Sequence, residues 1–363
     1  MINKLVLENL KHRPIRTLLS TIAIGIQVTM VLTLVGLSEG LLQDQANRTR
    51  GIGADVMVRA PGSSILSFST AMPAGILTFV RKQPHVTLAT GVLIQPAGGL
   101  NSVTGLNLDE FTRLSGGFRF VSGGPFKQPN DVIVDDFYAA QHKTHTGDSI
   151  TILNRPWHVC GIVEAGMLAR VIVRLDVLQD LTSTNDKLTS VYVKLDDANK
   201  IDAVVADLKT KLRDYPIYSI PEYTSLFSVK NVPMLKEFIG VIIGLGVLVG
   251  FLVVFLSMYT AVLERTREIG VLKALGASPG YILSILLRET TILALAGSVL
   301  GILLAYVTRW AIKSAVPGSL IQAIVPSWWP IATGIALFGA LVGAIYPGIK
   351  AARQDAIEAL SYD

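Results

Sequence analysis

Residues 264–276 form a charged segment directly after an uncharged, proline-free run of 26 residues, 238–263. Glutamates and arginines three or four residues apart on a helix can neutralise one another, so one interpretation is a water-facing segment that satisfies its own charges. The segment also carries Ile269, Leu272 and Leu275 at threefold spacing. An apolar series beside charge on an exposed helix is typical of a helix that docks in a groove of a protein partner. We favour docking over the self-neutralised segment.

The two ends of this short helix are marked in the sequence. Gly276 predicts its end, because glycine adopts positive φ at little steric cost. Ser278 followed by Pro279 predicts the N-cap and first residue of the next helix. The preceding run, 238–263, would be about 39 Å long as a helix, more than the roughly 30 Å of a bilayer's hydrocarbon layer. The predicted order is therefore span, short charged helix, turn and span.

Other residues that could do chemistry form no convincing site. His142 and His145 could share a helix face, but they lack a clear third ligand, and we interpret them as solvated histidines. The segment Leu114-Ser115-Gly116-Gly117-Phe118 looks like the signature motif of an ABC ATPase. The sequence contains no Gly-x-x-x-x-Gly-Lys-Ser/Thr phosphate loop, however, so we interpret the likeness as coincidence. The sequence predicts no catalytic residue, no metal site and no cofactor on this chain.

Composition points to a membrane rather than to nucleic acid. The 363 residues are 50% hydrophobic and only 16% charged, which is apolar-rich for a soluble protein. The net charge of +5 comes from basic residues that cluster beside apolar runs, as the positive-inside rule expects. A single cysteine, Cys160, excludes an intrachain disulfide, and we interpret it as a small core residue.

Four apolar runs indicate an α-helical membrane protein with four transmembrane helices. We predict them at residues 17–40, 233–263, 281–312 and 330–350. Residues 1–16 predict an interfacial helix, 264–280 the charged helix and its turn, 313–329 a loop and 351–363 a tail. Trp310, Trp328 and Trp329 suit the aromatic belt at one membrane interface.

Residues 41–232 have a different character, because charges, glycines and prolines return and no apolar run could cross a bilayer. Residues 198–212 predict a helix with one apolar face. Short runs rich in β-branched residues predict strands at 55–59, 132–134, 149–153, 158–163, 171–174 and 190–194. This mixture predicts an α+β domain inserted between transmembrane helices 1 and 2.

Basic residues predict the orientation. Nine of them lie near the spans on the side of residues 1–16, 264–280 and 350–363, against Arg309 and Lys313 in the opposite short loop. The positive-inside rule then places both termini and the charged helix in the cytoplasm and residues 41–232 outside. Arg288 and Glu289 predict a charge pair at membrane depth or its edge, where such residues tend to be functional or to snorkel.

The segment from Glu264-Arg265-Thr266-Arg267-Glu268-Ile269-Gly270 to Ala274-Leu275-Gly276-Ala277 resembles the one after the second span in MacB/FtsX-type permeases, the mechanotransmission class of ABC transporters. The tail Tyr346-Pro347-Gly348-Ile349-Lys350-Ala351-Ala352-Arg353 is similar to the closing motif of that family, although Ala356 stands where members often carry proline. The stretch from Thr146-Gly147-Asp148 to Gly161-Ile162-Val163 resembles the MacB-like periplasmic core. The likeness covers essentially the whole chain.

This resemblance implies a permease subunit in a bacterial inner membrane. It implies a separate cytoplasmic ABC ATPase that binds the ATP, a second permease copy or a paralogue, an optional periplasmic adaptor, and membrane lipids around the spans. The first two spans would continue outward as a stalk, and Gly240, Gly244, Gly246 and Gly250 would be close-approach positions for a neighbouring helix. By the same likeness the coupling helix contacts the ATPase through Glu264, Arg265, Arg267, Glu268, Ile269, Gly270, Leu272, Lys273, Leu275 and Gly276.

Three functions remain open at this point. The first is export of an amphipathic substrate such as a lipid, lipoprotein, peptide or drug. The second is FtsX-like signal transmission that regulates an extracytoplasmic partner without transport. The third is a membrane-anchored receptor without an ATPase. The size of the outside domain and its MacB-like stretch favour export.

Overall fold

The computed structural model describes residues 14–63, 70–97, 102–228, 231, 233–315 and 320–353. The chain divides into two compact units. The membrane unit comprises residues 1–39, 233–314 and 322–363, and the extracytoplasmic unit comprises residues 40–232 and 315–321. Most of the predicted interfacial helix, 1–13, and the end of the predicted tail, 354–363, lie outside the described residues.

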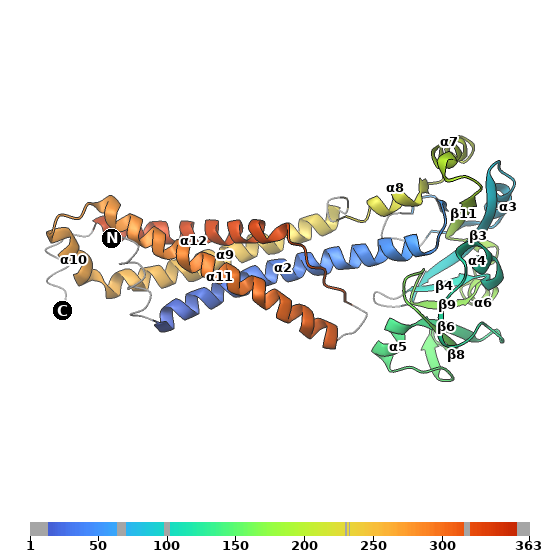
Figure 1. The fold of residues 1–363 in the computed structure, drawn as a ribbon, viewed down its shortest axis with the longest axis horizontal. Helices are drawn as coiled ribbons and strands as arrows, with labels where there is room; N and C mark the ends of the chain where they lie inside the picture. Colours follow the sequence, from blue (N-terminus) through green and yellow to red (C-terminus); the bar gives the residue numbers. More distant parts are fainter. Residues whose placement is uncertain are drawn as a thin grey trace. The chain divides into compact units, whose positions relative to one another are not determined.

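Within the described residues, four helices are long and apolar enough to cross a membrane (Figure 1). They are α2 (Pro14–Gly51), α9 (Pro233–Glu264), α11 (Pro279–Ala315) and α12 (Trp328–Arg353). The prediction of four transmembrane helices is confirmed. The helices extend past the apolar runs because polar residues continue the helical hydrogen bonding. In α2 that continuation reaches Gly51, so the first span and the polar stretch after it form one helix.

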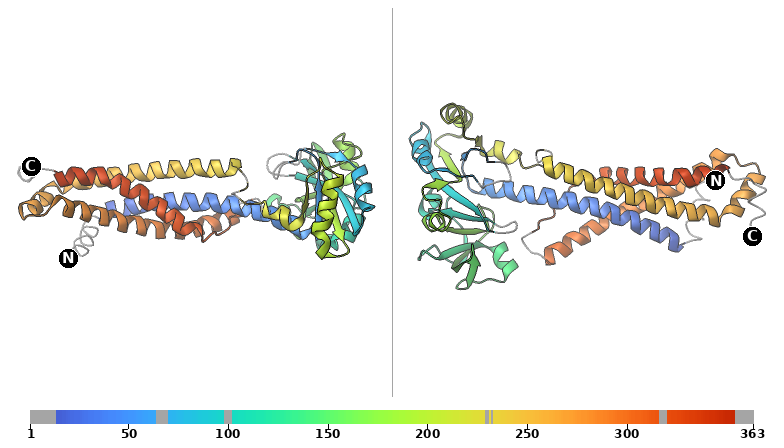
Figure 2. Two further views of the ribbon diagram at one scale, coloured as in Figure 1. Left: turned by 90° about the horizontal axis from the view of Figure 1, so that it is seen from above. Right: turned by 180° about the vertical axis from the view of Figure 1, so that it is seen from behind.

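Close backbone approach holds the membrane unit together. A Cβ added to Gly301 of α11 would lie 2.6 Å from Val28 Cβ and 2.7 Å from the Gly25 carbonyl oxygen of α2. The Thr29 hydroxyl donates to the Gly301 carbonyl oxygen at 3.0 Å across the same contact. Helices α9 and α12 run side by side (Figure 2), and a Cβ at Gly343 would lie 2.7 Å from the Phe251 carbonyl oxygen. Small residues thus let helices approach where hydrocarbon offers no hydrophobic drive between them.

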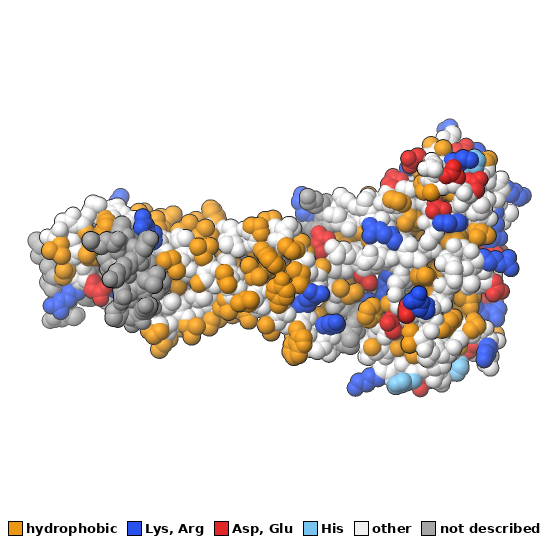
Figure 3. Space-filling model, in the orientation of Figure 1, with side chains coloured by type: hydrophobic (Ala, Val, Ile, Leu, Met, Phe, Trp, Pro, Cys, Tyr) orange, Lys and Arg blue, Asp and Glu red, His pale blue; other side chains and the backbone are white. Residues whose placement is uncertain are grey.

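The outer surface of the long helices is apolar. Hydrophobic side chains cover much of them in Figure 3, whereas charged side chains gather over the strand-bearing unit. Val241, Leu252, Trp310 and Phe338 are 69%, 46%, 72% and 64% exposed. Large apolar side chains exposed in such number are expected where the surrounding solvent is lipid.

The extracytoplasmic unit is built on a mixed sheet that has ten strands within the described residues. Pairing is antiparallel except between β4 and β9 and between β6 and β8, which are parallel. Along the sheet the order is β12 (Ile217–Ser219), β1 (Val56–Arg59), β11 (Ser190–Leu195), β3 (Val86–Pro96), β4 (Ser102–Leu106), β9 (Val171–Arg174), β6 (Asp131–Asp135), β8 (Arg155–Val163) and β5 (Phe120–Gly123), with β7 (Ser149–Ile152) paired to β8. A separate pair joins β2 (Met72–Pro73) to β10 (Lys187–Leu188).

Short helices cover this sheet and enclose two cores. One core lies around Val58, Val193 and Leu208, the other around Val134, Trp157 and Val173. The helices are α3 (Gly75–Arg81), α4 (Leu108–Ser115), α5 (Asp136–His142), α6 (Leu175–Leu181), α7 (Ile201–Lys211) and α8 (Ile220–Ser225), with a 3₁₀ turn, η1, at Ala198–Lys200. Strands mixed with helices between the first and second spans confirm the predicted inserted α+β domain.

The motifs that offered chemistry have structural roles here. The Leu114–Phe118 stretch is the end of α4, where Gly116 and Gly117 both have positive φ. His142 stacks on Tyr138 with ring centroids 4.3 Å apart. The His145 ring lies 3.7 Å from the Asp148 carboxylate. Helix ends and local contacts therefore account for these residues.

Candidate coupling site after the second span

The charged segment forms a short helix, α10 (Thr266–Ala274), after a break in helical geometry at Arg265. At its end the Gly276 N–H donates to the Lys273 carbonyl oxygen and the Ala277 N–H to that of Leu272, both at 2.9 Å. With φ of +92° at Gly276, this is a Schellman cap. The Ser278 hydroxyl then accepts from the Tyr281 N–H at 3.3 Å, and Pro279 opens α11. Both helix ends are as the sequence predicts.

One side of α10 is packed against the membrane unit. Arg265, Thr266, Ile269 and Gly270 are buried, and Ile269 belongs to the same apolar cluster as Ile282 and Leu286 of α11. The Thr266 hydroxyl donates to the Leu263 carbonyl oxygen at 2.9 Å, which ties the first turn of α10 to the end of α9. The helix is therefore fixed to the bundle along one face.

A buried ion pair reinforces this attachment. Arg265 Nη1 lies 3.2 Å from Glu289 Oε2 of α11, and the two side chains are 8% and 1% exposed. Away from water the attraction between opposite charges is strong, and either charge alone would be costly to bury. The pair therefore links Arg265, at the start of α10, to Glu289 of α11 and restricts movement of one helix relative to the other.

The two residues of the predicted Arg288–Glu289 charge pair differ in their surroundings. Adjacent residues on a helix point about 100° apart. Glu289 faces inward to Arg265, while Arg288 is exposed. The sequence analysis did not identify Arg265 as a partner of Glu289, because the two residues lie 24 positions apart.

The other side of α10 is exposed. Arg267 and Glu268 carry its exposed charges beside Glu264 at the end of α9, and Val271 and Leu275 are 45% and 81% exposed. Leu272 and Lys273 are half-buried, and Gly276 is exposed at the turn. The expected apolar series does not share one surface, because threefold spacing falls 60° short of a full turn at each step. Ile269 faces the bundle, whereas Leu275 faces outward beside Val271. The sequence analysis did not select Val271.

A second charged cluster, also missed, anchors the far end of α2 within the extracytoplasmic unit. The Arg48 guanidinium lies 2.8 Å from Asp44 and 3.0 Å from Asp135, and it donates to the Leu168 carbonyl oxygen at 3.2 Å. Arg170 lies 3.6 Å from Asp44 and 3.9 Å from Asp135. Arg48 and Asp44 of α2 thus form ion pairs with Asp135 and Arg170 of the strand-bearing fold.

The two aspartates of this cluster keep the Arg48 guanidinium protonated and positively charged. Burial lowers the pKa of Arg48, but Asp44 and Asp135 together raise it above its ordinary value. Burial raises the pKa of Asp135, although Arg48 and the Tyr138 N–H act in the opposite direction. Burial and the adjacent Arg48 lower the pKa of Arg170. No local sequence pattern indicated this cluster, since its members come from residues 44, 48, 135 and 170.

Four helices that are long and apolar enough to cross a membrane, a domain between the first two and a short helix after the second define a multi-pass membrane protein with one large inserted domain. Residues 17–211 match the family of the MacB-like periplasmic core domain, and residues 240–356 match the FtsX-like permease C-terminal family. The chain belongs to the MacB/FtsX-like ABC transporter permeases.

Two curated relatives illustrate the similarity. The chain is 31% identical over 238 residues to the uncharacterized ABC transporter permease YknZ of Bacillus subtilis, covering 60% of this chain and 57% of YknZ. It is 25% identical over 394 residues to the macrolide export ATP-binding/permease protein MacB of Escherichia coli, covering 99% of this chain and 60% of MacB. The chain thus spans less than two thirds of either relative. The crystal structure of the periplasmic region of MacB from Actinobacillus actinomycetemcomitans aligns with 50% of this chain at 15% identity and a TM-score of 0.37.

Proposed function

We propose that this chain is the permease subunit that couples ATP hydrolysis by a separate cytoplasmic ATPase to movement of its extracytoplasmic unit, and that it exports an amphipathic substrate. The observation that carries the proposal is the two-sided character of α10. Its inner face contacts α11 through the Arg265–Glu289 ion pair and the packing of Ile269, while its outer face carries exposed charged side chains and the exposed Leu275. A helix held so firmly on one side is suited to receive a force on the other.

In this mechanism the outer face of α10 sits in a groove of the ATPase. Arg267 and Glu268 would pair with opposite charges on the ATPase and so fix the alignment of the helix in the groove. Val271 and Leu275 would supply the apolar contacts. When the ATPases close on nucleotide, α10 moves with them, and its attachments to α9 and α11 carry that motion into the spans. Since α2 continues as one helix to Gly51, it can act as a stiff lever. The Arg48 cluster then ties the end of this lever to the sheet.

The proposed orientation places α10 and both termini in the cytoplasm of a bacterial cell, with the chain in the inner membrane. The excess of basic residues beside the spans on that side supports it. The complex would contain a second permease, as an identical copy or a paralogue, and an adaptor could join it outside. The substrate would be taken up on the outer side of the membrane rather than carried between the spans.

A charge-reversed pair on α10 tests the docking role. The doubly substituted variant Arg267→Glu/Glu268→Arg keeps net charge but inverts its pattern on exposed positions. We expect it to lose most of the ATPase subunit in a mild-detergent purification from the native host and to lose stimulation of ATP hydrolysis. The matched control is Arg119→Glu/Glu164→Arg, which inverts an exposed ion pair of the extracytoplasmic unit. Equal recovery of the ATPase with both variants would contradict the proposal.

The same purification separates the alternative functions. Repeated recovery of the wild-type chain without any nucleotide-hydrolysing partner would favour a receptor. An ATPase that co-purifies together with a cell-wall hydrolase, without substrate export by the intact complex, would favour signal transmission.

A further inference from the structure

A basic side chain joins two helices at the end of the membrane unit that carries α10. Lys350, near the end of α12, donates to the Tyr259 hydroxyl of α9 at 3.1 Å. Its ammonium nitrogen also lies 4.9 Å from the centre of the Tyr259 ring, within cation–π range. Among the described residues no carboxylate pairs with Lys350, so this part of the chain does not neutralise its charge. Lys350 and Arg353, about one helical turn apart, are both exposed.

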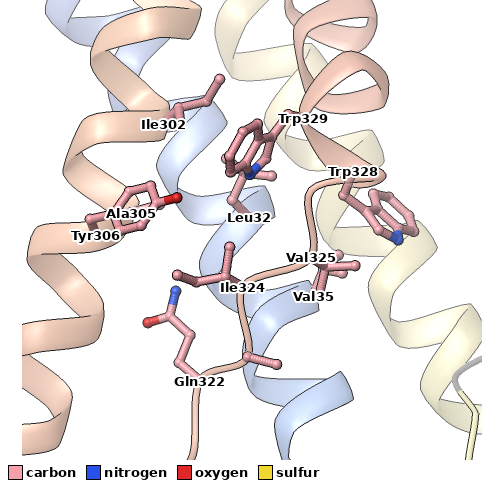
Figure 4. Close-up of a pocket in the computed structure, with 11 residues that line it drawn as sticks. Leu32, Val35, Ile302, Ala305, Tyr306, Gln322, Ile324, Val325, Trp328 and Trp329 are labelled. Carbon is pink, nitrogen blue, oxygen red and sulfur yellow. The ribbon is translucent and has the colours of Figure 1, made fainter.

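The length of α12 indicates the depth of these residues in the membrane. Trp328 and Trp329 open the helix, and the Trp329 ring lies 6.4 Å from that of Tyr306 of α11 (Figure 4). Aromatic side chains of this kind favour the boundary between lipid headgroups and acyl chains. From Trp328 to Lys350 a helix rises about 33 Å, close to the roughly 30 Å of the hydrocarbon layer. Lys350 and Tyr259 therefore lie at the opposite headgroup level, on the side of α10.

An aromatic strip, made of Phe251, Phe255, Tyr259 and Tyr346, leads from this level towards the middle of the membrane. Along α9 the first three recur every fourth residue, and successive rings have centroids 5.9 and 6.1 Å apart. Tyr346 of α12 lies 5.9 Å from Phe255 across the junction of the two helices. The three α9 rings are half-buried and Tyr346 is 60% exposed, so part of the strip faces the surrounding lipid.

The order of these groups matches the parts of an anionic phospholipid. A phosphate diester carries one negative charge on its unesterified oxygens, and the acyl chains follow it towards the middle of the bilayer. The Lys350 ammonium has further N–H groups to donate to those oxygens, and the Tyr259 hydroxyl, which accepts from Lys350, can donate its own hydrogen. A lipid with a net negative charge suits the site better than a zwitterionic one, because the ammonium of phosphatidylethanolamine would be repelled by Lys350 and Arg353.

We propose that Lys350 and Tyr259 bind the phosphate of an anionic phospholipid in the leaflet on the α10 side, with one acyl chain lying along the aromatic strip. Arg353 adds to the positive potential that attracts the headgroup. The bound lipid would contact both α9 and α12 and so restrain the end of α9 that leads into α10. This inference does not depend on the identity of the exported substrate or of the ATPase.

Native mass spectrometry of the purified full chain with added lipid tests the site. The probes are palmitoyl-oleoyl-phosphatidylglycerol, which is anionic, and palmitoyl-oleoyl-phosphatidylethanolamine, which has the same chains and no net charge. We expect wild-type protein to retain about threefold to tenfold more of the anionic lipid, the effect of a basic side chain near the membrane surface. Lys350→Gln should lose most of that preference. Tyr259→Phe, which keeps the ring and removes the hydroxyl, should lose part of it.

The matched control is Lys313→Gln, which removes an exposed lysine at the end of α11 remote from α10. This variant should keep the wild-type preference. Equal retention of the two lipids by wild type, or an unchanged preference in Lys350→Gln, would overturn the proposal. An equally large loss of preference in Lys313→Gln would also overturn it, because a general effect of net charge would then account for the selectivity.

Discussion

The Arg265–Glu289 pair shows how much one buried contact can fix in a membrane protein. Both side chains are nearly inaccessible, and they join residues 24 positions apart. In a medium of low polarity, removing one partner strands the other as an uncompensated charge. The pair is thus a constraint on where α10 can sit, because the helix cannot leave α11 without separating the charges.

A double-mutant cycle measures this constraint. We predict that Arg265→Met and Glu289→Gln each destabilise the chain by about 3–5 kcal/mol, since each removes one charge of a buried ion pair. The double variant should cost much less than the sum, because no unpaired charge remains. Thermal unfolding of the purified protein in one detergent gives the comparison. Additive losses would mean that the two side chains act independently.

Cys160 offers a separate test in the extracytoplasmic unit. Burial, with a smaller contribution from the negative charge of Asp131, raises the pKa of the Cys160 thiol from 9.0 to about 12. The thiol also lies 3.5 Å from the Val132 carbonyl oxygen. Cys160 is half-buried rather than part of the fully buried core, and its raised pKa disfavours the reactive thiolate that a redox centre would use.

We predict that iodoacetamide modifies Cys160 at pH 8 at least 100-fold more slowly in the folded protein than in urea. Only the thiolate reacts, and a pKa raised by three units lowers its fraction about 1,000-fold. The folded rate should keep rising about tenfold per pH unit beyond pH 9, where an ordinary thiol levels off. Mass spectrometry of timed samples gives both rates, and equal rates in the two states would refute the pKa assignment.

At the scale of elements, glycines show what sequence alone could not tell. Four glycines of α9 looked alike as close-approach positions, but among the described residues only two of them have a side chain opposite: Gly250 faces Gln27, and Gly246 faces Met30 and Gln27. Gly240 and Gly244 have open space beside them. A Cβ at Gly301 or Gly343 would lie 2.7 Å from a backbone carbonyl oxygen of the neighbouring helix, and the sequence analysis selected neither glycine. A glycine's role depends on which helix lies opposite, and that is tertiary information.

A matched pair of alanine substitutions tests this assignment. In Gly301→Ala the new Cβ would press on the Gly25 carbonyl oxygen at 2.7 Å, so α2 and α11 must separate. We predict a loss of about 1–3 kcal/mol, the usual cost of overpacking. Gly244→Ala should be neutral or slightly stabilising, because alanine favours the helix and meets nothing. Unfolding temperatures in one detergent decide the matter, and equal effects would contradict the packing described.

The same distinction applies to other elements: features set by the local sequence were predicted, and features set by tertiary packing were not. The cap at Gly276 and the start at Ser278-Pro279 follow from local backbone chemistry, and both were predicted. Strands β3 and β4 were missed, because Gly91 and Gly105 interrupt their apolar pattern and mark close contacts with Leu188 and Leu178. The sequence analysis placed Ile269 and Leu275 of the α10 segment in one apolar series, but Ile269 is buried and Leu275 is exposed, because packing against the bundle decides which side of the helix is buried.

For the whole molecule, span count, the inserted domain and family were all accessible from the sequence, since apolar run length and motif are local properties. The Arg48 cluster was not, because it gathers residues that are distant in sequence. In the function proposed above, force would pass from α10 through the spans to the continuous α2 and the Arg48 cluster.

Distance measurement between two extracytoplasmic units of the assembled complex tests this most directly. Spin labels at Thr210→Cys, an exposed position of α7, in a Cys160→Ala background would report the separation with and without trapped ATP. We predict a clear nucleotide-dependent shift with the native α10, and none with Arg267→Glu/Glu268→Arg in the presence of excess ATPase. An identical shift in that variant, or no shift with native α10, would contradict the account.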